Sequence, residues 1–430
     1  MNFRKRTGFC AAVLAFICAA GGCGSGNEVV NLPDNGKEVI SLSFFGNKYE
    51  PENVTVIEEI LSSFIEENPD IRVSYESLKG TEYYDALRKR MAAGKGDDVF
   101  MVNHDAVLEL EAAGQLADLS GLDTISGFTD RMLGQMVEDG KIYWVPTSVS
   151  VFGLYCNMDL LKQHGQMLPE NLEQWLAVCR YFMEREITPV IANNDISLKT
   201  LAIGRGFYAV YEENRQAEVM ARLNSGEDKL SSYLSSGFAL AEELIDSGYI
   251  DRQKALVTNK TSDDLEEFLR GESPFMLTGA WAAGRVRGME PDFAFQVIPY
   301  PVLEDGNLLV INADTRLSVN ADSSHLEAAM KFVEYFTRAE NIGKFADQQS
   351  SFSPLMGGSP SSVAEIQPLI ECYQSGRTVF GADGFLELPI WDLTAQVSVM
   401  LLSGNSLEES MEWLDGQTKS LGGNSEEKGQ

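Results

Sequence analysis

The segment Val39-Ile-Ser-Leu-Ser-Phe-Phe45 begins the unit that decides the fold, because it is short, apolar and rich in strand-forming residues. Apolar residues then recur with helical spacing from Ile57 to Ile65. Asn68-Pro69 ends that predicted helix, and a second strand is predicted over Ile71–Tyr75. Strands that alternate with helices in this way indicate an α/β fold with a mostly parallel sheet.

The alternation recurs along the chain. Further strands are predicted over 99–102, 152–156, 187–192, 273–278, 293–298 and 317–320. Helices are predicted over 172–183 and from Leu326 to Phe336, where apolar residues again follow helical spacing. We therefore predict two α/β lobes, each with its own mostly parallel sheet flanked by helices.

The charge of the chain excludes one class of partner. The 430 residues contain 34 Lys and Arg against 64 Asp and Glu, which gives a formal net charge of −30. Such a surface repels phosphate backbones, so no nucleic-acid partner is expected.

Motifs for catalysis, cofactors and metals were sought next. The three histidines, His104, His164 and His325, do not have zinc-helix spacing, and the sequence contains neither a nucleophile elbow nor a phosphate-binding loop. No cofactor, metal or catalytic residue is therefore expected. A hydrolase with paired carboxylates stays open, because the many acidic residues provide many pairs.

The N-terminus predicts export. Three basic residues, Arg4 to Arg6, precede an apolar run from Phe9 to Ala20, which is the pattern of a signal peptide. Small residues then lead to Cys23, which resembles a bacterial lipobox whose cysteine receives a diacylglyceryl group. Ordinary secretion is the alternative. The predicted divisions are a lipoprotein signal peptide at 1–22, a lipidated flexible tether at 23–38 and a polar tail at 422–430.

These features predict an extracytoplasmic protein that is lipid-anchored to the outer face of the bacterial cell membrane and contacts the membrane through that anchor alone. Three further cysteines, Cys156, Cys179 and Cys372, are interpreted as small buried apolar residues. One pair among them could instead form a disulfide.

Seven motifs follow one another in a characteristic order. They are Phe64-Ile-Glu-Glu-Asn68-Pro69, Gly94-Lys-Gly-Asp97-Asp98-Val-Phe, Leu110-Glu-Ala-Ala-Gly114-Gln-Leu-Ala-Asp118-Leu, Lys141-Ile-Tyr-Trp144-Val-Pro146 with Gly153-Leu-Tyr155-Cys156-Asn157, Pro169 to Trp175, Gly271-Glu-Ser-Pro-Phe-Met-Leu-Thr-Gly279-Ala280-Trp281, and Pro299-Tyr-Pro301 with Leu317-Ser-Val-Asn320. Their order and spacing resemble the family-1 extracellular solute-binding proteins of ABC importers, which include maltodextrin-binding and other sugar-binding lipoproteins. The chain departs from that pattern with Asp97 in place of proline, with Cys156 in place of an aromatic residue, and at Asn312–Arg316, where the family is rich in glycine.

The resemblance implies a hinged receptor of the type II periplasmic-binding-protein fold, with a ligand cleft between its lobes. An N-terminal lobe would comprise 39–148 plus 312–355, and a C-terminal lobe 149–308 plus 360–421. The resemblance also implies a small-molecule ligand, most simply a sugar, and delivery to the transmembrane subunits of an ABC permease. Two alternatives stay open, a tethered carbohydrate-active enzyme and a sensor that serves a membrane kinase.

Ligands of open α/β sheets lie beyond the carboxyl ends of strands. Phe45 and Asn47 end the first predicted strand, and Asn103 and Asp105 follow the third. The amide and carboxylate groups match sugar hydroxyls. A role as turn or helix-cap residues is the alternative, and it weighs most at Asp105.

Sugar rings also need flat apolar surfaces. Trp281 and Trp391 resemble aromatic positions of the family cleft, while Trp144 either lines the cleft or packs at the hinge. Arg316 either faces the cleft, which would favour acidic sugars such as uronates, or forms a surface ion pair. The candidate ligand-binding set is Phe45, Asn47, Asn103, Asp105, Trp144, Trp281, Arg316 and Trp391.

Overall fold

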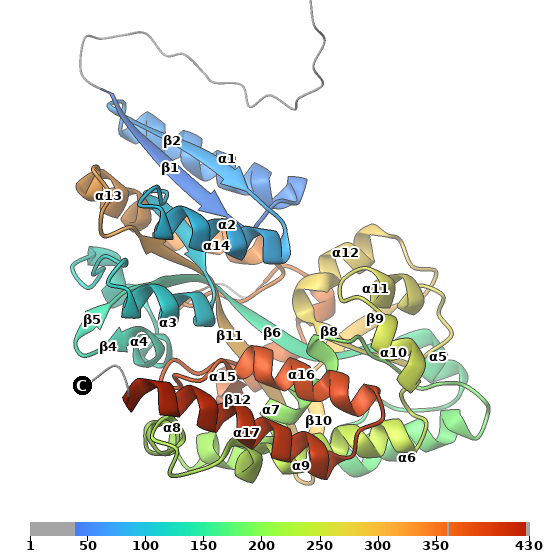
Figure 1. The fold of residues 1–430 in the computed structure, drawn as a ribbon. Helices are drawn as coiled ribbons and strands as arrows, with labels where there is room; N and C mark the ends of the chain where they lie inside the picture. The colour runs from blue at the N-terminus through green and yellow to red at the C-terminus, as the bar shows by residue number, and fades with distance from the viewer. Residues whose placement is uncertain (1–38, 359–360, 427–430) are drawn as a thin grey trace, which may run out of the picture. The chain divides into compact units, whose positions relative to one another are not determined.

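A computed structural model of the chain describes residues 39–358 and 361–426 (Figure 1). The predicted signal peptide, the lipidation site Cys23 and the tether lie outside the described residues, as does the end of the predicted tail. No helix within the described ranges is long and apolar enough to cross a bilayer.

The strands are β1 (Ile40–Gly46), β2 (Ile71–Ser77), β3 (Val99–Val102), β4 (Val137–Glu138), β5 (Lys141–Ile142), β6 (Val145–Asn157), β7 (Val190–Ile191), β8 (Phe275–Gly279), β9 (Phe295–Ile298), β10 (Tyr300–Leu303), β11 (Gly306–Val319) and β12 (Thr378–Phe380). The α-helices are α1 (Pro51–Glu67), α2 (Gly80–Ala92), α3 (His104–Ala112), α4 (Asp130–Met136), α5 (Met158–Gln163), α6 (Leu172–Met183), α7 (Ile196–Glu212), α8 (Gln216–Asn224), α9 (Leu230–Asp246), α10 (Arg252–Val257), α11 (Asp263–Phe268), α12 (Ala283–Gly288), α13 (Leu326–Phe336), α14 (Ala339–Gln348), α15 (Leu369–Ser375), α16 (Ile390–Leu402) and α17 (Leu407–Glu426).

The predicted α/β fold class is confirmed, but the sheet differs from the prediction. One continuous sheet runs in the order β2-β1-β3-β11-β6-β8-β7, with β10 and β12 paired to β11 and β9 paired to β6. The pairs β1–β2, β1–β3, β11–β12 and β7–β8 are parallel, whereas every pair of β6 and the pairs of β11 with β3, β6 and β10 are antiparallel. The sheet therefore contains both parallel and antiparallel pairs. The predicted lobes do not have separate sheets, because the two long strands β6 and β11 run through the centre of a single one.

Two hydrophobic cores lie along this sheet. In the first, Phe64 and Phe336 both pack edge-to-face on Phe332, at centroid distances of 5.2 and 6.1 Å, beneath β1. In the second, α7, α9, α16 and α17 contact one another and cover the other end of the sheet (Figure 1). Burial of each aromatic ring contributes about 1.5–3 kcal/mol. Because alternate residues of β6, β8 and β11 belong to different cores, the two cores stabilise opposite faces of these strands.

Several local predictions are confirmed. Helix α6 spans the predicted residues 172–183, and the Asn171 side chain caps it by accepting a hydrogen bond of 3.0 Å from the backbone nitrogen of Gln174. Cys156, Cys179 and Cys372 are free and buried, as interpreted from the sequence.

Candidate functional site

Strands β6 and β11 present one polar face. In their antiparallel pairing Ser148 lies opposite Asp314, Ser150 opposite Asn312 and Pro146 opposite Arg316. Residues opposite one another in a ladder share a face of the sheet. We call Ser148, Ser150, Asn312, Asp314 and Arg316 the polar face.

The opposite face of the same two strands is apolar. Val149, Val151 and Ile311, which alternate with the polar residues, are fully buried in the first core. The polar face is therefore not part of that core, although Ser148 and Arg316 retain only 1% and 3% exposure.

A backbone irregularity interrupts β11 at this face. Thr315 has a φ of 45°, a left-handed conformation that is uncommon for a residue other than glycine. The Thr147 hydroxyl donates a hydrogen bond of 2.8 Å to the Thr315 carbonyl, and Arg316 Nε donates one of 2.9 Å to the Ala313 carbonyl. A left-handed backbone conformation at a residue other than glycine costs about 1–3 kcal/mol, and such residues cluster at binding and active sites.

Two predicted residues from the first sheet strands reach this region, and their roles differ. Asn47 Nδ2 donates a hydrogen bond of 3.2 Å to the Tyr84 hydroxyl, and the Tyr84 phenol interacts electrostatically with Asp314 and Arg316. Asn103 instead caps α3, since its Oδ1 accepts a hydrogen bond of 2.9 Å from the backbone nitrogen of Ala106. The structure thus places Asn47 beside the polar face and shows Asn103 in the helix-cap role that was the alternative.

Asp105 forms a close pair with a second carboxylate. Its carboxyl group interacts electrostatically with that of Asp392, at the start of α16. Burial and the neighbouring Asp392 raise the pKa of Asp105 to about 6, while Arg316 and Lys199 act in the opposite direction. The sequence analysis missed Asp392, although it directly follows the candidate Trp391.

Two tryptophans flank the polar face at its other end. Phe152 lies two residues beyond Ser150 on β6, and its ring centroid is 5.0 Å from that of Trp281 and 5.5 Å from that of Trp391. Residue 279 must be glycine, because a Cβ there would lie 2.1 Å from the Trp281 ring. The two predicted tryptophans are therefore brought together around one phenylalanine, both of them half-buried.

A buried lysine supports Trp391. Lys199 Nζ lies 4.2 Å from the centroid of the Trp391 ring and 2.5 Å from Asp195 Oδ1. Burial lowers the pKa of Lys199 to about 8, and the Asp195 carboxylate opposes that shift. A sequence signal for Lys199 was absent, because it lies within an apolar helix far along the chain from Trp391.

Arg316 does not form the surface ion pair that was its alternative. Its guanidinium carbon lies 3.9 Å from the centroid of the Trp144 ring, and its Nη1 is buried without a hydrogen-bond partner. Burial lowers the pKa of Arg316 to about 10. Phe45, by contrast, has no exposed surface, since its ring packs on Tyr83 at 4.5 Å and beneath Arg90.

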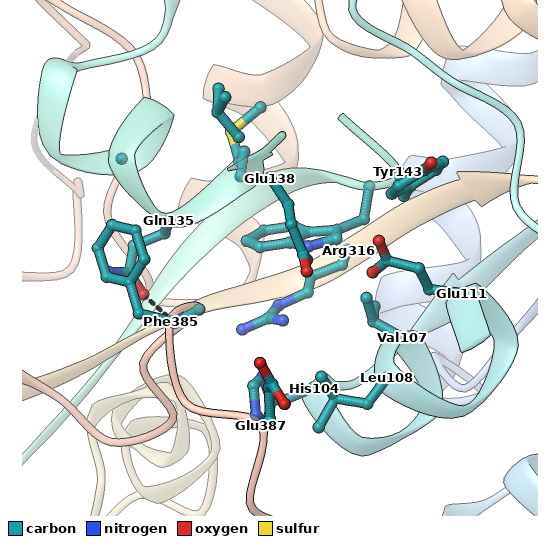
Figure 2. Close-up of a pocket in the computed structure, with 15 residues that line it drawn as sticks. His104, Val107, Leu108, Glu111, Gln135, Glu138, Tyr143, Arg316, Phe385 and Glu387 are labelled. Carbon is teal, nitrogen blue, oxygen red and sulfur yellow. Dashed lines mark hydrogen bonds between the residues drawn. The ribbon is translucent and has the colours of Figure 1, made fainter. Parts of the chain in front are cut away.

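Arg316 and Trp144 border a pocket of about 180 Å³. Figure 2 shows the Arg316 guanidinium among side chains of α3, of the segment 134–138 and of the loop 384–387. This loop is held by His104, whose Nε2 lies 2.8 Å from the Leu386 carbonyl. Burial, followed by the charge of Arg316, lowers the pKa of His104 to about 3, so its imidazole is neutral.

Unpartnered polar atoms concentrate in this region. Buried side-chain nitrogen and oxygen atoms usually have a hydrogen-bond partner. Eight within the described residues have none, and five of the eight belong to this region: Asn47 Oδ1, Asp105 Oδ1, Ser148 Oγ, Thr315 Oγ1 and Arg316 Nη1. The arrangement can therefore donate and accept hydrogen bonds to a polar ligand beside two tryptophans. The described part of the chain contains no group of three or more His, Cys, Asp or Glu suited to a metal ion.

Comparison with known proteins identifies the family of this chain. The model for bacterial extracellular solute-binding proteins matches residues 49–342, so the chain belongs to this family. The Multiple sugar-binding protein of Streptococcus mutans is 24% identical over 351 residues, which cover 77% of this chain and 79% of that protein. The Maltodextrin-binding protein MdxE of Bacillus subtilis is 26% identical over 319 residues and 72% of each chain.

The fold is also that of solved relatives. The structure of a family 1 extracellular solute-binding protein from Bifidobacterium longum subsp. infantis matches with a TM-score of 0.73 and 20% identity, over 89% of this chain and all of that one. The fold class inferred from the sequence motifs is thus confirmed.

Proposed function

We propose that this protein captures an extracellular carbohydrate, most simply an oligosaccharide, at the polar face and delivers it to an ABC permease. The observation that carries the proposal is the cluster of unpartnered buried polar atoms beside Trp281 and Trp391. Sugar hydroxyls would satisfy the polar atoms, and the C–H faces of a sugar ring would pack on the indoles. Relatives named for binding multiple sugars and maltodextrin support this ligand class.

The proposal includes the two lobes expected from the sequence, 39–148 plus 312–355 and 149–308 plus 360–421. The boundaries near 148 and 312 fall within β6 and β11, and the boundary near 355–360 follows α14. Both strands contribute residues to both cores. Closure around the ligand would then bend the two strands that both cores share.

We also propose that the protein acts outside the cell, held by a lipid on Cys23, and binds its ligand without transforming it. A matched relative from Streptomyces antibioticus is named as a lipoprotein. The family is defined by solute binding, which supports a non-catalytic role. Loss of membrane attachment in a Cys23→Ala variant, followed by cell fractionation, tests the anchor.

A thermal-shift screen tests the ligand class. Purified protein is heated with maltotriose, raffinose, xylotriose, glucuronate and spermidine, each in a separate sample. A sugar present at about 100 times its Kd adds roughly 2.7 kcal/mol to the stability of the folded protein and raises the melting temperature by several degrees. A rise with spermidine but with none of the sugars would overturn the carbohydrate assignment, and consumption of a sugar during the assay would indicate an enzyme.

A further inference from the structure

The pocket beside Trp144 shares Arg316 with the polar face but differs from it in its other charged side chains. Three carboxylates line it, Glu111 from α3, Glu138 from β4 and Glu387 from the loop 384–387. Figure 2 shows Glu111, Glu138 and Glu387 around the Arg316 guanidinium. The neutral His104 adds no positive charge. The acidic side chains that line the pocket therefore outnumber its cations.

Two of these carboxylates interact with each other. Glu111 is half-buried, and its carboxylate interacts electrostatically with that of the exposed Glu138. Burial, and then the charge of Glu138, raise the pKa of Glu111 to about 7. Two neighbouring carboxylates repel each other when both are ionised, so a proton or a bound cation stabilises the Glu111–Glu138 pair.

A second observation points to a ligand. Arg316 is 3% exposed, its Nη1 lacks a partner, and its guanidinium is directed into the pocket (Figure 2). A buried donor without an acceptor costs about 1–3 kcal/mol, so an oxygen atom of a ligand would relieve that cost. The site thus offers carboxylates to a positive group and a donor to an oxygen.

The aromatic rings and the volume of the pocket restrict the class of ligand further. Tyr143, Trp144 and Phe385 contribute flat apolar surface to the pocket. Its volume of about 180 Å³ is below the about 300–1,000 Å³ of typical small-molecule pockets. The pocket therefore has room for one sugar unit or a smaller group.

We propose that this pocket is a binding site for an amine-bearing sugar unit, whose ammonium group lies between Glu111 and Glu138 and whose oxygen accepts from Arg316. An ammonium group forms charge-assisted hydrogen bonds with the two carboxylates. A uronate would instead bring a fourth carboxylate toward three others. The site reverses the charge preference that Arg316 alone suggested. It shares Arg316 with the polar face but takes its charge preference from Glu111 and Glu138, which lie outside that face.

Isothermal titration of the purified protein with glucosamine tests this proposal, with glucose, N-acetylglucosamine and glucuronate as matched probes. We expect saturable binding of glucosamine, at least tenfold tighter than that of each other probe. Glu111→Gln should weaken glucosamine binding at least tenfold. Glu109→Gln is the control on the same helix, because Glu109 pairs with Arg88 outside the pocket and its loss should leave the affinity unchanged.

Other outcomes separate this site from the polar face. Trp391→Ala should weaken binding of a neutral oligosaccharide at least thirtyfold and leave glucosamine binding intact. If Glu111→Gln fails to fold, the exposed Glu138→Gln variant tests the same pair. Absence of glucosamine binding, equal or tighter binding of glucuronate, or loss of glucosamine binding in Trp391→Ala but not in the glutamate variants would overturn the proposal. Failure of all neutral oligosaccharides alone would contradict only the function proposed for the polar face.

Discussion

The two faces of the β6–β11 pair show how one stretch of backbone can serve stability and recognition at once. On one face Val149, Val151 and Ile311 are fully buried among apolar neighbours. On the other, Ser148 and Arg316 are nearly as buried, yet each has a polar atom without a partner. Burial alone thus does not distinguish a core from a site, whereas unsatisfied hydrogen-bonding capacity does.

The apolar face should account for stability. Ile311→Ala should lower the free energy of unfolding by about 2–5 kcal/mol, because it removes packed methyl groups and leaves a cavity. Ser150→Ala, from the position paired with Asn312 on the other face, is the control and should cost less than about 1 kcal/mol. Urea denaturation measures both values. Equal losses would show that the two faces do not differ as described.

The aromatic end of the polar face should account for affinity. Trp391→Ala should weaken sugar binding by about 2 kcal/mol or more, roughly thirtyfold, since aromatic residues at binding sites often dominate the energy. Trp413, half-buried on α17, provides the control, and its replacement by alanine should leave the affinity unchanged. Calorimetric titration compares the two variants. Equal weakening by both would show that binding is not localised at Trp391.

The carboxylate pair should make stability depend on pH. Asp105 binds its proton more tightly in the folded protein, with a pKa of about 6 against an ordinary 3.8. Its contribution, about 1–3 kcal/mol, is therefore fully present below pH 3.8 and is lost as the pH rises through about 6. Asp105→Asn should flatten the decline in melting temperature over this interval. Glu111, with a raised pKa of about 7, continues the decline above it. An unchanged profile in Asp105→Asn would contradict the raised pKa.

The smallest effect is expected at Ser148, where one substitution tests a role in stability against a role in binding. Ser148→Ala removes a buried hydroxyl without a partner, so the stability of the ligand-free protein should stay the same or rise slightly. Sugar affinity should fall by about 0.5–1.5 kcal/mol, because one hydrogen bond to the ligand is lost. Melting and titration of the same preparation give both numbers. A destabilised variant with full affinity would assign Ser148 to the core.

Much of the fold could be predicted from the sequence, because a local pattern of apolar residues indicates long helices such as α6 and α13 and buried strands such as β3. The start of β6 could not be predicted, because Pro146, Ser148 and Ser150 lack the apolar character of a central strand. Ser148 and Ser150 belong instead to the polar face, where Pro146 lies opposite Arg316. Because β6 was predicted only in part, the antiparallel pairing of β6 with β11 was not predicted, and a mostly parallel sheet was expected instead of the mixed one.

The candidate site was predicted in part. Asn47, Asp105, Trp281, Arg316 and Trp391 could be proposed from strand ends and motifs, and the structure brings them to one region. Phe45 is buried because Tyr83 and Arg90 of α2 cover its ring. Lys199 and Asp392 become visible only once the chain has folded, since pairing across the molecule gives no local sequence signal.

Sugar binding at the polar face, near Trp281 and Trp391, is the main function that we propose. Calorimetric titration of the wild-type protein and of Trp391→Ala with a panel of neutral oligosaccharides tests it most directly. We expect saturable binding of at least one sugar by the wild type and at least thirtyfold weaker binding by a folded Trp391→Ala variant. Sugar binding that is unchanged in that variant would place the ligand elsewhere and overturn the proposed site.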